Sequence, residues 1–224
     1  MITRVAKRIL DILGSSVGLI VSLPIMLVVA VLVKLDSRGP VFYTQQRVGL
    51  NHRKNGRRYH QKVGADSRRS GDRRIKNLYG RPFQMIKFRT MVNDAEGSSG
   101  PVWATKGDPR VTRLGRLLRR SRIDEIPQFF NVLLGDMSLV GPRPERPSFV
   151  EELSGQVDNY QQRLQVKPGI TGLAQVETGY DSSLDSVQEK VRLDLAYINS
   201  ISFWTDLKIL ARTVIVVITG RGAC

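Results

Sequence analysis

The chain alternates apolar and polar residues in two short segments and repeats apolar residues at helical spacing in several longer ones. Residues 39–49 (GPVFYTQQRVG) and Pro82–Phe88 (PFQMIKF) have the composition of short strands, and we expect them to pair as a β-hairpin. Helices are predicted at residues 112–120, 121–134, 147–166, 184–199 and 205–219. Residues 135–147 form a predicted loop, and residues 167–176 a turn followed by a strand. These elements predict an α+β fold that is mostly helical with a small β-hairpin.

The segment 121–134 has the clearest two-sided pattern. Its apolar side holds Ile123, Ile126, Phe129, Phe130, Leu133 and Leu134, and its polar side holds Asp124, Glu125, Gln128 and Asn131. The last predicted helix, 205–219, is apolar enough to pack on the core or to lie at a membrane interface as an amphipathic helix.

Residues 12–33 carry no charge and are long enough to cross roughly 30 Å of hydrocarbon as a helix. Two features favour a helix that enters and leaves the same leaflet over a single transmembrane span. Ser22 and Pro24 lie at the centre, where a proline deletes a helix hydrogen bond and bends the axis. Basic residues flank both ends, so the positive-inside preference draws both ends to the cytoplasm. We therefore expect a re-entrant membrane helix at 1–38 and a catalytic domain on the cytoplasmic face at 39–224.

The 224 residues carry a net charge of +15, which predicts an anionic partner: nucleic acid, an acidic lipid surface or a phosphorylated metabolite. Residues 51–80 contain ten Lys or Arg and two Asp, and form either a solvated basic insertion or a docking segment, for which we favour a lipid surface. Cys224 is the only cysteine, and the two histidines, His52 and His60, lie in this insertion. The remaining sequence therefore has no thiol or imidazole in its interior, and acid–base chemistry there falls to carboxylates.

Asp124 and Glu125 are adjacent acids that precede a loop with Arg143 between two prolines. One alternative is structural: Ser121 and Asp124 resemble a capping box, and Asp124 could itself cap a helix. The other is catalytic, with the two acids in separate roles because neighbouring helical side chains point about 100° apart. The predicted phosphate-binding residues, whose planar or ammonium cations suit a pyrophosphate, are Lys87, Arg89, Arg119 and Arg143.

Several motifs occur in the order found in one bacterial family: GPVFYTQQRVG, IKFRTM, DPRVTRLGRLLR, IDEIPQFFNVLLGDMSLVGPRP and VKPGITGLAQV. On these motifs the chain resembles the bacterial sugar transferases, also described as polyprenyl-phosphate hexose-1-phosphate transferases or monotopic phosphoglycosyl transferases. The likeness covers nearly everything except 51–80. The departures are IDEIPQ where Leu-Asp-Glu-Leu-Pro is commoner, and Leu173 where Trp is frequent. With no large domain before the membrane segment, the chain resembles the minimal catalytic form.

The resemblance implies a UDP-sugar donor, a membrane polyprenyl phosphate acceptor such as undecaprenyl phosphate, and Mg²⁺. It implies that Asp124 attacks the sugar-bearing phosphate and contacts the metal, and that Glu125 assists in metal binding or proton handling. It maps the break of the re-entrant helix onto Ser22 and Pro24. The implied setting is the cytoplasmic face of the bacterial inner membrane, at the first membrane step of exopolysaccharide, O-antigen or glycoconjugate synthesis.

The sequence leaves the sugar undetermined, because the motifs address phosphate, metal and lipid. We expect no nucleic-acid partner for a transferase, and a homodimer is left open. The alternative from another class is a membrane-tethered basic protein that binds nucleic acid or acidic lipid without catalysis, with 51–80 as its working part.

Overall fold

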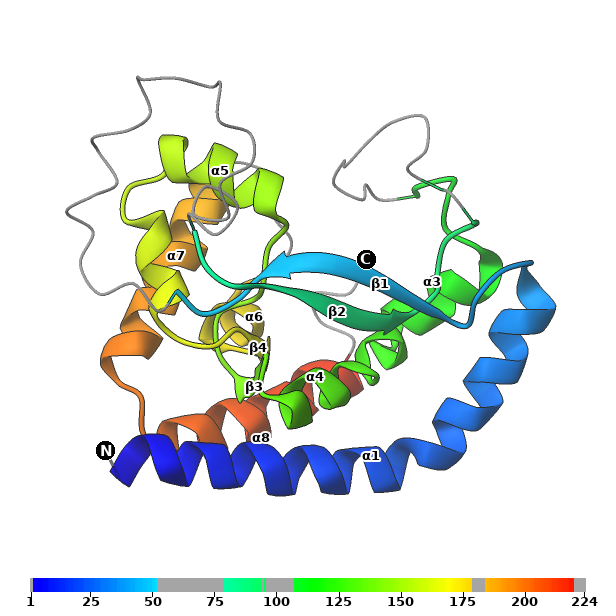
Figure 1. Cartoon of the computed structure of the whole chain (residues 1–224), viewed down its shortest axis with the longest axis horizontal. Helices are drawn as coiled ribbons and strands as arrows, with labels where there is room; N and C mark the ends of the chain where they lie inside the picture. Colours follow the sequence, from blue (N-terminus) through cyan, green and yellow to red (C-terminus); the bar gives the residue numbers. More distant parts are fainter. Residues whose placement is uncertain (1, 52–78, 94, 96–106, 179–183, 220–224) are drawn as a thin grey trace.

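The computed structural model describes residues 2–51, 79–93, 95, 107–178 and 184–219 (Figure 1). It is mostly helical, with two small two-stranded sheets and a long N-terminal helix. Most of the predicted basic insertion, 51–80, lies outside the described residues.

Helix α1 (Ile2–Asp36) runs along one side of the molecule and then changes direction (Figure 1). Pro24 lies inside it without ending it. Ser22 Oγ donates to the carbonyl of Gly18 at 2.6 Å, a back-bond that adds to the bending effect of the proline. Residues 5–36 form the one helix, in the part of the chain that the structure describes, that is long and apolar enough to cross a membrane. Many of its apolar side chains, such as Ile20 and Val21, are exposed.

The predicted hairpin is confirmed. Strand β1 (Phe42–Val48) pairs antiparallel with β2 (Pro82–Phe88), with Gln45 opposite Met85. Along β2, Phe83 and Met85 are buried on one face, in the second of the clusters described below. Phe88, at the end of the strand and on the other face, is buried against α1.

The predicted helix at 112–120 is confirmed as α3 (Arg113–Arg120), whose N-cap Thr112 accepts from the Gly115 amide. The single helix predicted at 121–134 is wrong: the segment divides into a 3-10 turn, η2 (Ile123–Glu125), and helix α4 (Gln128–Leu134). Arg122, in the left-handed region at φ 56°, separates α3 from η2. A residue in this conformation interrupts the helical backbone angles. The helix therefore ends there, although the spacing of apolar residues in the sequence continues.

Two further predictions need correction. The helix predicted at 147–166 is two elements, α5 (Pro147–Gln156) and the 3-10 segment η3 (Tyr160–Gln165), separated at Asn159, whose φ is 59°. In 167–176 the strand is limited to β4 (Gly169–Thr171), and helix α6 (Leu173–Glu177) replaces its expected continuation. β4 pairs in parallel with β3 (Ser138–Val140), a strand inside the segment that we expected to be a loop. Helices α7 (Leu184–Asn199) and α8 (Phe203–Thr219) match the prediction.

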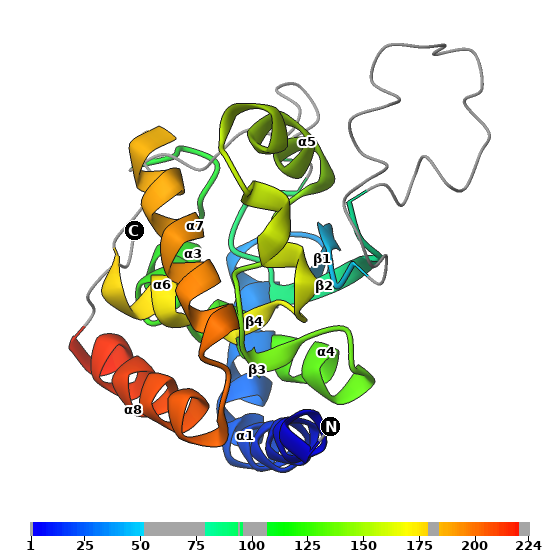
Figure 2. The same ribbon diagram turned by 90° about the vertical axis from the view of Figure 1, so that its left-hand side faces the viewer.

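Three buried apolar clusters hold these elements together. The first joins β1 to α5, η3 and α7, and the second joins β2, α4 and β3 to α7 and α8. The third places Phe88 and Leu118 against the second half of α1, with Ile123 and Ile126 packed on its edge. Seen along the first part of α1, α4 and α8 lie on its two sides, and β3 lies above it (Figure 2). The segment that carries Asp124 therefore rests directly on the bent helix.

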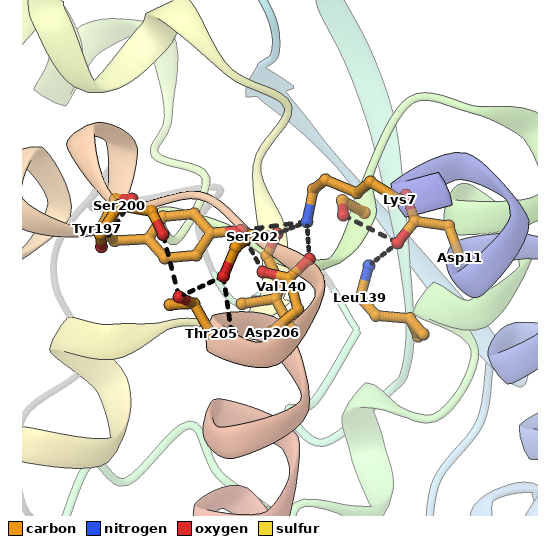
Figure 3. Close-up of polar contacts among 10 residues, drawn as sticks. Lys7, Asp11, Leu139, Val140, Tyr197, Ser200, Ser202, Thr205 and Asp206 are labelled. Carbon is orange, nitrogen blue, oxygen red and sulfur yellow. Dashed lines mark hydrogen bonds and ion pairs between the residues drawn. The ribbon is translucent and has the colours of Figure 1, made fainter. Parts of the chain in front are cut away.

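The first part of α1 is bonded to the folded body. Lys7 Nζ donates to Asp206 Oδ2 at 2.7 Å, to Tyr197 Oη at 3.0 Å and to the Val140 carbonyl at 2.9 Å (Figure 3). One turn further, Asp11 Oδ1 accepts from the Leu139 amide at 2.8 Å. These contacts join α1 to β3 and α8.

The far end of α1 is bonded to the same body. The buried Arg89 donates to the carbonyls of Val33 at 3.1 Å, Ser37 at 2.6 Å and Arg38 at 2.6 Å. The last carbonyls of a helix have no partner within it, so Arg89 acts as a side-chain cap for α1.

Candidate functional site

Asp124 lies in the middle of η2, and its side chain is buried, with the residue 7% exposed. It is not a helix cap: η2 begins after Arg122, α4 has Pro127 at its N-cap position, and neither has a side-chain cap bond. Ser121 is not a cap of this segment either, because it ends α3 and its hydroxyl donates back to the Leu117 carbonyl at 2.9 Å. The capping alternative is therefore wrong.

The Asp124 carboxylate makes no hydrogen bond to another described residue. Burial raises the pKa of Asp124 to about 6, and the nearby Lys87 ammonium keeps it from rising further. At neutral pH the carboxylate is mostly ionised and poorly solvated, and its oxygens accept no hydrogen bond from the described residues. A carboxylate in this state is suited to act as a nucleophile or as a cation ligand.

Glu125 is in the opposite situation. Its Oε1 accepts from Lys87 Nζ at 3.0 Å and from Arg143 Nη2 at 2.6 Å. Burial alone would raise the pKa of Glu125. The charges of Arg143 and Lys87, with Arg143 the stronger of the two, instead hold this pKa well below its usual value. Glu125 is thus a fixed anion that gathers two cations beside Asp124.

The structure brings together most of the predicted phosphate-binding residues. Lys87 comes from β2, Arg143 from the loop after β3, and both reach Glu125. Arg119, near the end of α3, donates from Nε to Thr90 Oγ1 at 2.9 Å, and its charge helps to lower the pKa of Asp124. Arg89 is placed differently: its guanidinium is bound to the carbonyls at the end of α1. Its contacts assign it to the anchoring of the membrane helix beside the site.

Sequence reasoning missed Arg47 and Arg163, which bind the backbone of the Arg143 loop. Arg47 Nη1 donates to the Pro144 carbonyl at 3.0 Å, and Arg163 Nη2 donates to the Arg143 carbonyl at 3.2 Å. Arg47 comes from β1 and Arg163 from η3, both far from the loop in sequence. No local pattern marks a residue whose contacts are this remote.

The carboxylates of the site indicate how it could bind a metal ion. The described residues contain no group of three His, Cys, Asp or Glu side chains that could enclose an ion. Mg²⁺ is commonly bound by one or two carboxylates together with substrate phosphates and waters. The unbonded Asp124 carboxylate, with the less occupied Oε2 of Glu125 next to it, fits this open mode of binding.

The family model for bacterial sugar transferases matches residues 2–59 and 66–220. The chain belongs to the bacterial sugar transferase family. A relative from Aeromonas hydrophila is 40% identical over 97% of this chain and 44% of its own length; it is named a UDP-N-acetylgalactosamine-undecaprenyl-phosphate N-acetylgalactosaminephosphotransferase. Two relatives are named UDP-glucose:undecaprenyl-phosphate glucose-1-phosphate transferases. One, from Klebsiella pneumoniae, is 40% identical over 95% of this chain and 40% of its own length. The other, from Caulobacter vibrioides, is 38% identical over 93% of this chain and 68% of its own length.

This bacterial sugar transferase thus spans less than half the length of the first two relatives that it matches. The described part of the match includes every element that builds the site, from α1 through β2 and η2 to the Arg143 loop.

Proposed function

We propose that this bacterial sugar transferase moves a hexose-1-phosphate from a UDP-sugar to undecaprenyl phosphate, with Asp124 as the nucleophile. One observation carries the proposal: two adjacent acids are placed in opposite electrostatic states. Glu125 is neutralised by Lys87 and Arg143, whereas Asp124 is buried, without a hydrogen bond to a described residue, and ionised above pH about 6.

In the first step a carboxylate oxygen of Asp124 forms a bond to the sugar-bearing phosphorus of the donor. The bond from that phosphorus to the bridging oxygen breaks, and UMP leaves with the electron pair. In the second step a phosphate oxygen of the acceptor attacks the same phosphorus and the aspartyl oxygen leaves, which restores Asp124. Splitting the transfer in this way replaces one difficult displacement by two easier ones, in keeping with covalent catalysis.

The basic side chains counter the repulsion between anions in both steps. Arg143 and Lys87 can turn part of their hydrogen-bonding capacity from Glu125 to the phosphate oxygens of the donor, and Arg119 adds positive charge beside Asp124. Mg²⁺ held by Asp124, with Glu125 as second carboxylate, would supply further charge neutralisation on the phosphates when bound.

We further propose that α1 is re-entrant and that the protein sits on the cytoplasmic face of the inner membrane. Lys7 bonds one end of α1 to α8, and Arg89 bonds the other end to the segment after β2. A straight span would put these two ends on opposite sides of about 30 Å of hydrocarbon, so attachment of both to one folded body supports a bent helix that returns to its own side. The acceptor lipid would then meet Asp124 at the membrane surface.

The relatives differ in the sugar that their names carry, so we leave the sugar open. The alternative of a non-catalytic binding protein depends on 51–80, which lies mostly outside the described residues. The arrangement around Asp124 has no role in such a binding protein, which favours the transferase.

The test uses purified protein with Mg²⁺, undecaprenyl phosphate and a panel of UDP-sugars, and measures UMP release. At least one sugar should give UMP, and Asp124→Asn should give none. Asp158→Asn, the same change at an exposed aspartate, is the matched control and should keep full activity. Labelled donor without acceptor should leave phosphosugar on wild-type protein.

Two outcomes would overturn the proposal. Label retained on the Asp124→Asn protein would refute the nucleophile. No UMP from any sugar, together with tight and salt-sensitive nucleic-acid binding, would favour the binding protein instead. For topology, single cysteines placed at residues 4 and 38 in a Cys224→Ser background should both be labelled from the cytoplasmic side.

A further inference from the structure

The loop that carries Arg143 is held through an unbroken row of backbone carbonyls. Each carbonyl from residue 142 to residue 145 accepts a hydrogen bond from outside the loop, and the four donors come from β4, η3 and β1. The donors, in order, are the Gly169 amide at 2.9 Å, Arg163 Nη2 at 3.2 Å, Arg47 Nη1 at 3.0 Å and the Val48 amide at 2.9 Å. The outer two donors are backbone groups, and the inner two are arginine side chains.

This loop depends on outside donors because of its composition. Pro142 and Pro144 have no backbone N–H, so the residues on either side of Arg143 cannot donate to a turn or a strand. The Arg143 side chain is itself 39% exposed, so packing around the guanidinium does little to fix it. The guanidinium reaches Glu125 only from a suitably placed backbone, so its position depends on where the loop is held as well as on the Glu125 charge.

Arg163 binds the loop backbone at the Arg143 carbonyl. Its side chain is buried, Nε donates to Asp194 Oδ2 at 3.0 Å and Nη1 donates to Tyr160 Oη at 3.0 Å. Nη2 contacts Asp194 at 2.7 Å and also reaches the Arg143 carbonyl. A planar guanidinium can donate to the Asp194 carboxylate, the Tyr160 hydroxyl and the Arg143 carbonyl at once, whereas the single ammonium of a lysine cannot.

Arg47 binds the loop backbone at the next carbonyl, that of Pro144. Its Nη1 also contacts Glu145 Oε2 at 3.2 Å, and its Nη2 donates to Gln45 Oε1 at 2.5 Å. Arg47 lies on β1 and Arg163 on η3, so the two guanidinium groups fix consecutive carbonyls from two separate elements.

We propose that Arg163 and Arg47 are positioning residues for the transfer reaction: they hold the carbonyls of Arg143 and Pro144 and so direct the Arg143 guanidinium to Glu125 and the donor phosphates. The proposal rests on the proposed function, which assigns Arg143 to those phosphates. Neither residue touches the reacting atoms in this assignment, and both act through Arg143.

The first test is Arg163→Lys, with Tyr160→Phe as the matched control. Tyr160→Phe removes a buried bond to the same guanidinium but leaves the bond to the Arg143 carbonyl in place. Since a displacement of about 1 Å in a positioned group can cost as much as a hundredfold in rate, we expect Arg163→Lys to lower kcat/KM by roughly ten- to a hundredfold. Tyr160→Phe should lower the melting temperature while kcat/KM changes less than about threefold.

A double-variant cycle separates positioning from a general loss of structure. If Arg163 acts through Arg143, Arg163→Lys should cause little further loss in an Arg143→Ala background, and it should change the same parameter, kcat or KM, that Arg143→Ala changes. A full additional loss in that background would overturn the proposal, as would a loss in Tyr160→Phe equal to that in Arg163→Lys. Failure of the proposed function is seen separately, because wild-type protein would then release no UMP.

Arg47 gives a second route should Arg163→Lys not fold. Arg47→Lys is compared with Gln45→Met, which removes a bond to the same guanidinium without touching the Pro144 carbonyl. Arg47→Lys should lose at least tenfold in kcat/KM, again without a further loss in the Arg143→Ala background, and Gln45→Met should stay close to wild type. Equal activity of Arg47→Lys and wild type would contradict the assignment of Arg47.

Discussion

Arg143 Nη2 donates to Glu125 Oε1 at 2.6 Å, so the acid next to Asp124 is already paired before any substrate arrives. This pairing separates the two acids chemically. Glu125 holds two cations in place, whereas the Asp124 carboxylate accepts no hydrogen bond from the described residues.

The first prediction concerns that pairing. Glu125→Gln keeps the size and one acceptor but removes the charge that faces Lys87 and Arg143, so both cations should lose their fixed positions. We expect kcat/KM to fall by at least a hundredfold, with a stability loss of about 1–3 kcal/mol from the weakened buried pair with Lys87. UMP release and thermal unfolding measure the two effects. A Glu125→Gln protein as active as wild type would show that cation placement does not depend on this charge.

The second prediction is the pH dependence of the first step. Burial raises the pKa of Asp124 to about 6, so single-turnover UMP release without acceptor should rise with pH through about 6 and then level off. Lys87 lowers this pKa, so Lys87→Gln should move the rise to higher pH. Omitting the acceptor matters because its phosphate also titrates. A pH profile that Lys87→Gln leaves in place would argue against Asp124 as the titrating group.

The third prediction is a gain in stability on loss of the Asp124 charge. The pKa of Asp124 rises from 3.8 to about 6 on folding, so the native state binds the proton more tightly than the unfolded state. Asp124 therefore costs no stability below pH about 4, and its cost grows between pH 4 and 6 and is complete above 6. Asp124→Asn removes a cost of about 2–3 kcal/mol at pH 7 by this linkage.

Thermal unfolding of wild type and Asp124→Asn at pH 4 and pH 7.5 tests this third prediction. The variant should melt higher at pH 7.5, and the difference should vanish at pH 4. Glu125 has the opposite linkage, with stability lost as pH falls through its lowered pKa, but both proteins contain it. A variant less stable than wild type at pH 7.5 would contradict the prediction.

The fourth prediction concerns the anchor of α1. Lys7→Met leaves Asp206, only 2% exposed at its side chain, without its cation, and should cost about 3–5 kcal/mol. Lys7→Met with Asp206→Leu removes both charges and should recover most of the loss in melting temperature. Arg192→Met, at an exposed pair with Glu189, is the control and should leave the melting temperature unchanged. A double variant no more stable than Lys7→Met would refute the pair as the source of the loss.

The elements with a local signal could be predicted from the sequence. The pairing of β1 with β2, the helices α3, α7 and α8, and the proximity of Lys87 and Arg143 to the acids all follow from short patterns or from motif order. The membrane helix followed from its uncharged length.

The rest depends on tertiary contacts. Arg122 takes a left-handed conformation that no local preference of arginine predicts, and this divides the expected helix at 121–134. β3 and β4 have three residues each, too few to establish an alternating pattern. Arg89 is predicted from the sequence to bind phosphate together with Lys87, two residues before it in IKFRTM. The position of the carbonyls at and after the end of α1, which the sequence does not encode locally, gives it other partners.

The ion pair between Lys7 and Asp206 joins residues 199 positions apart, and this has a consequence for biosynthesis. Helix α1 is made before the other described elements, yet Lys7 acquires its partner Asp206 only when synthesis has passed α7 and entered α8. Throughout that interval α1 lacks the ion pair of Lys7, although the partners of its other contacts, Arg89 and Leu139, have already been made. The attachment of α1 to the folded body is therefore completed late in synthesis, by a residue of the C-terminal half of the chain.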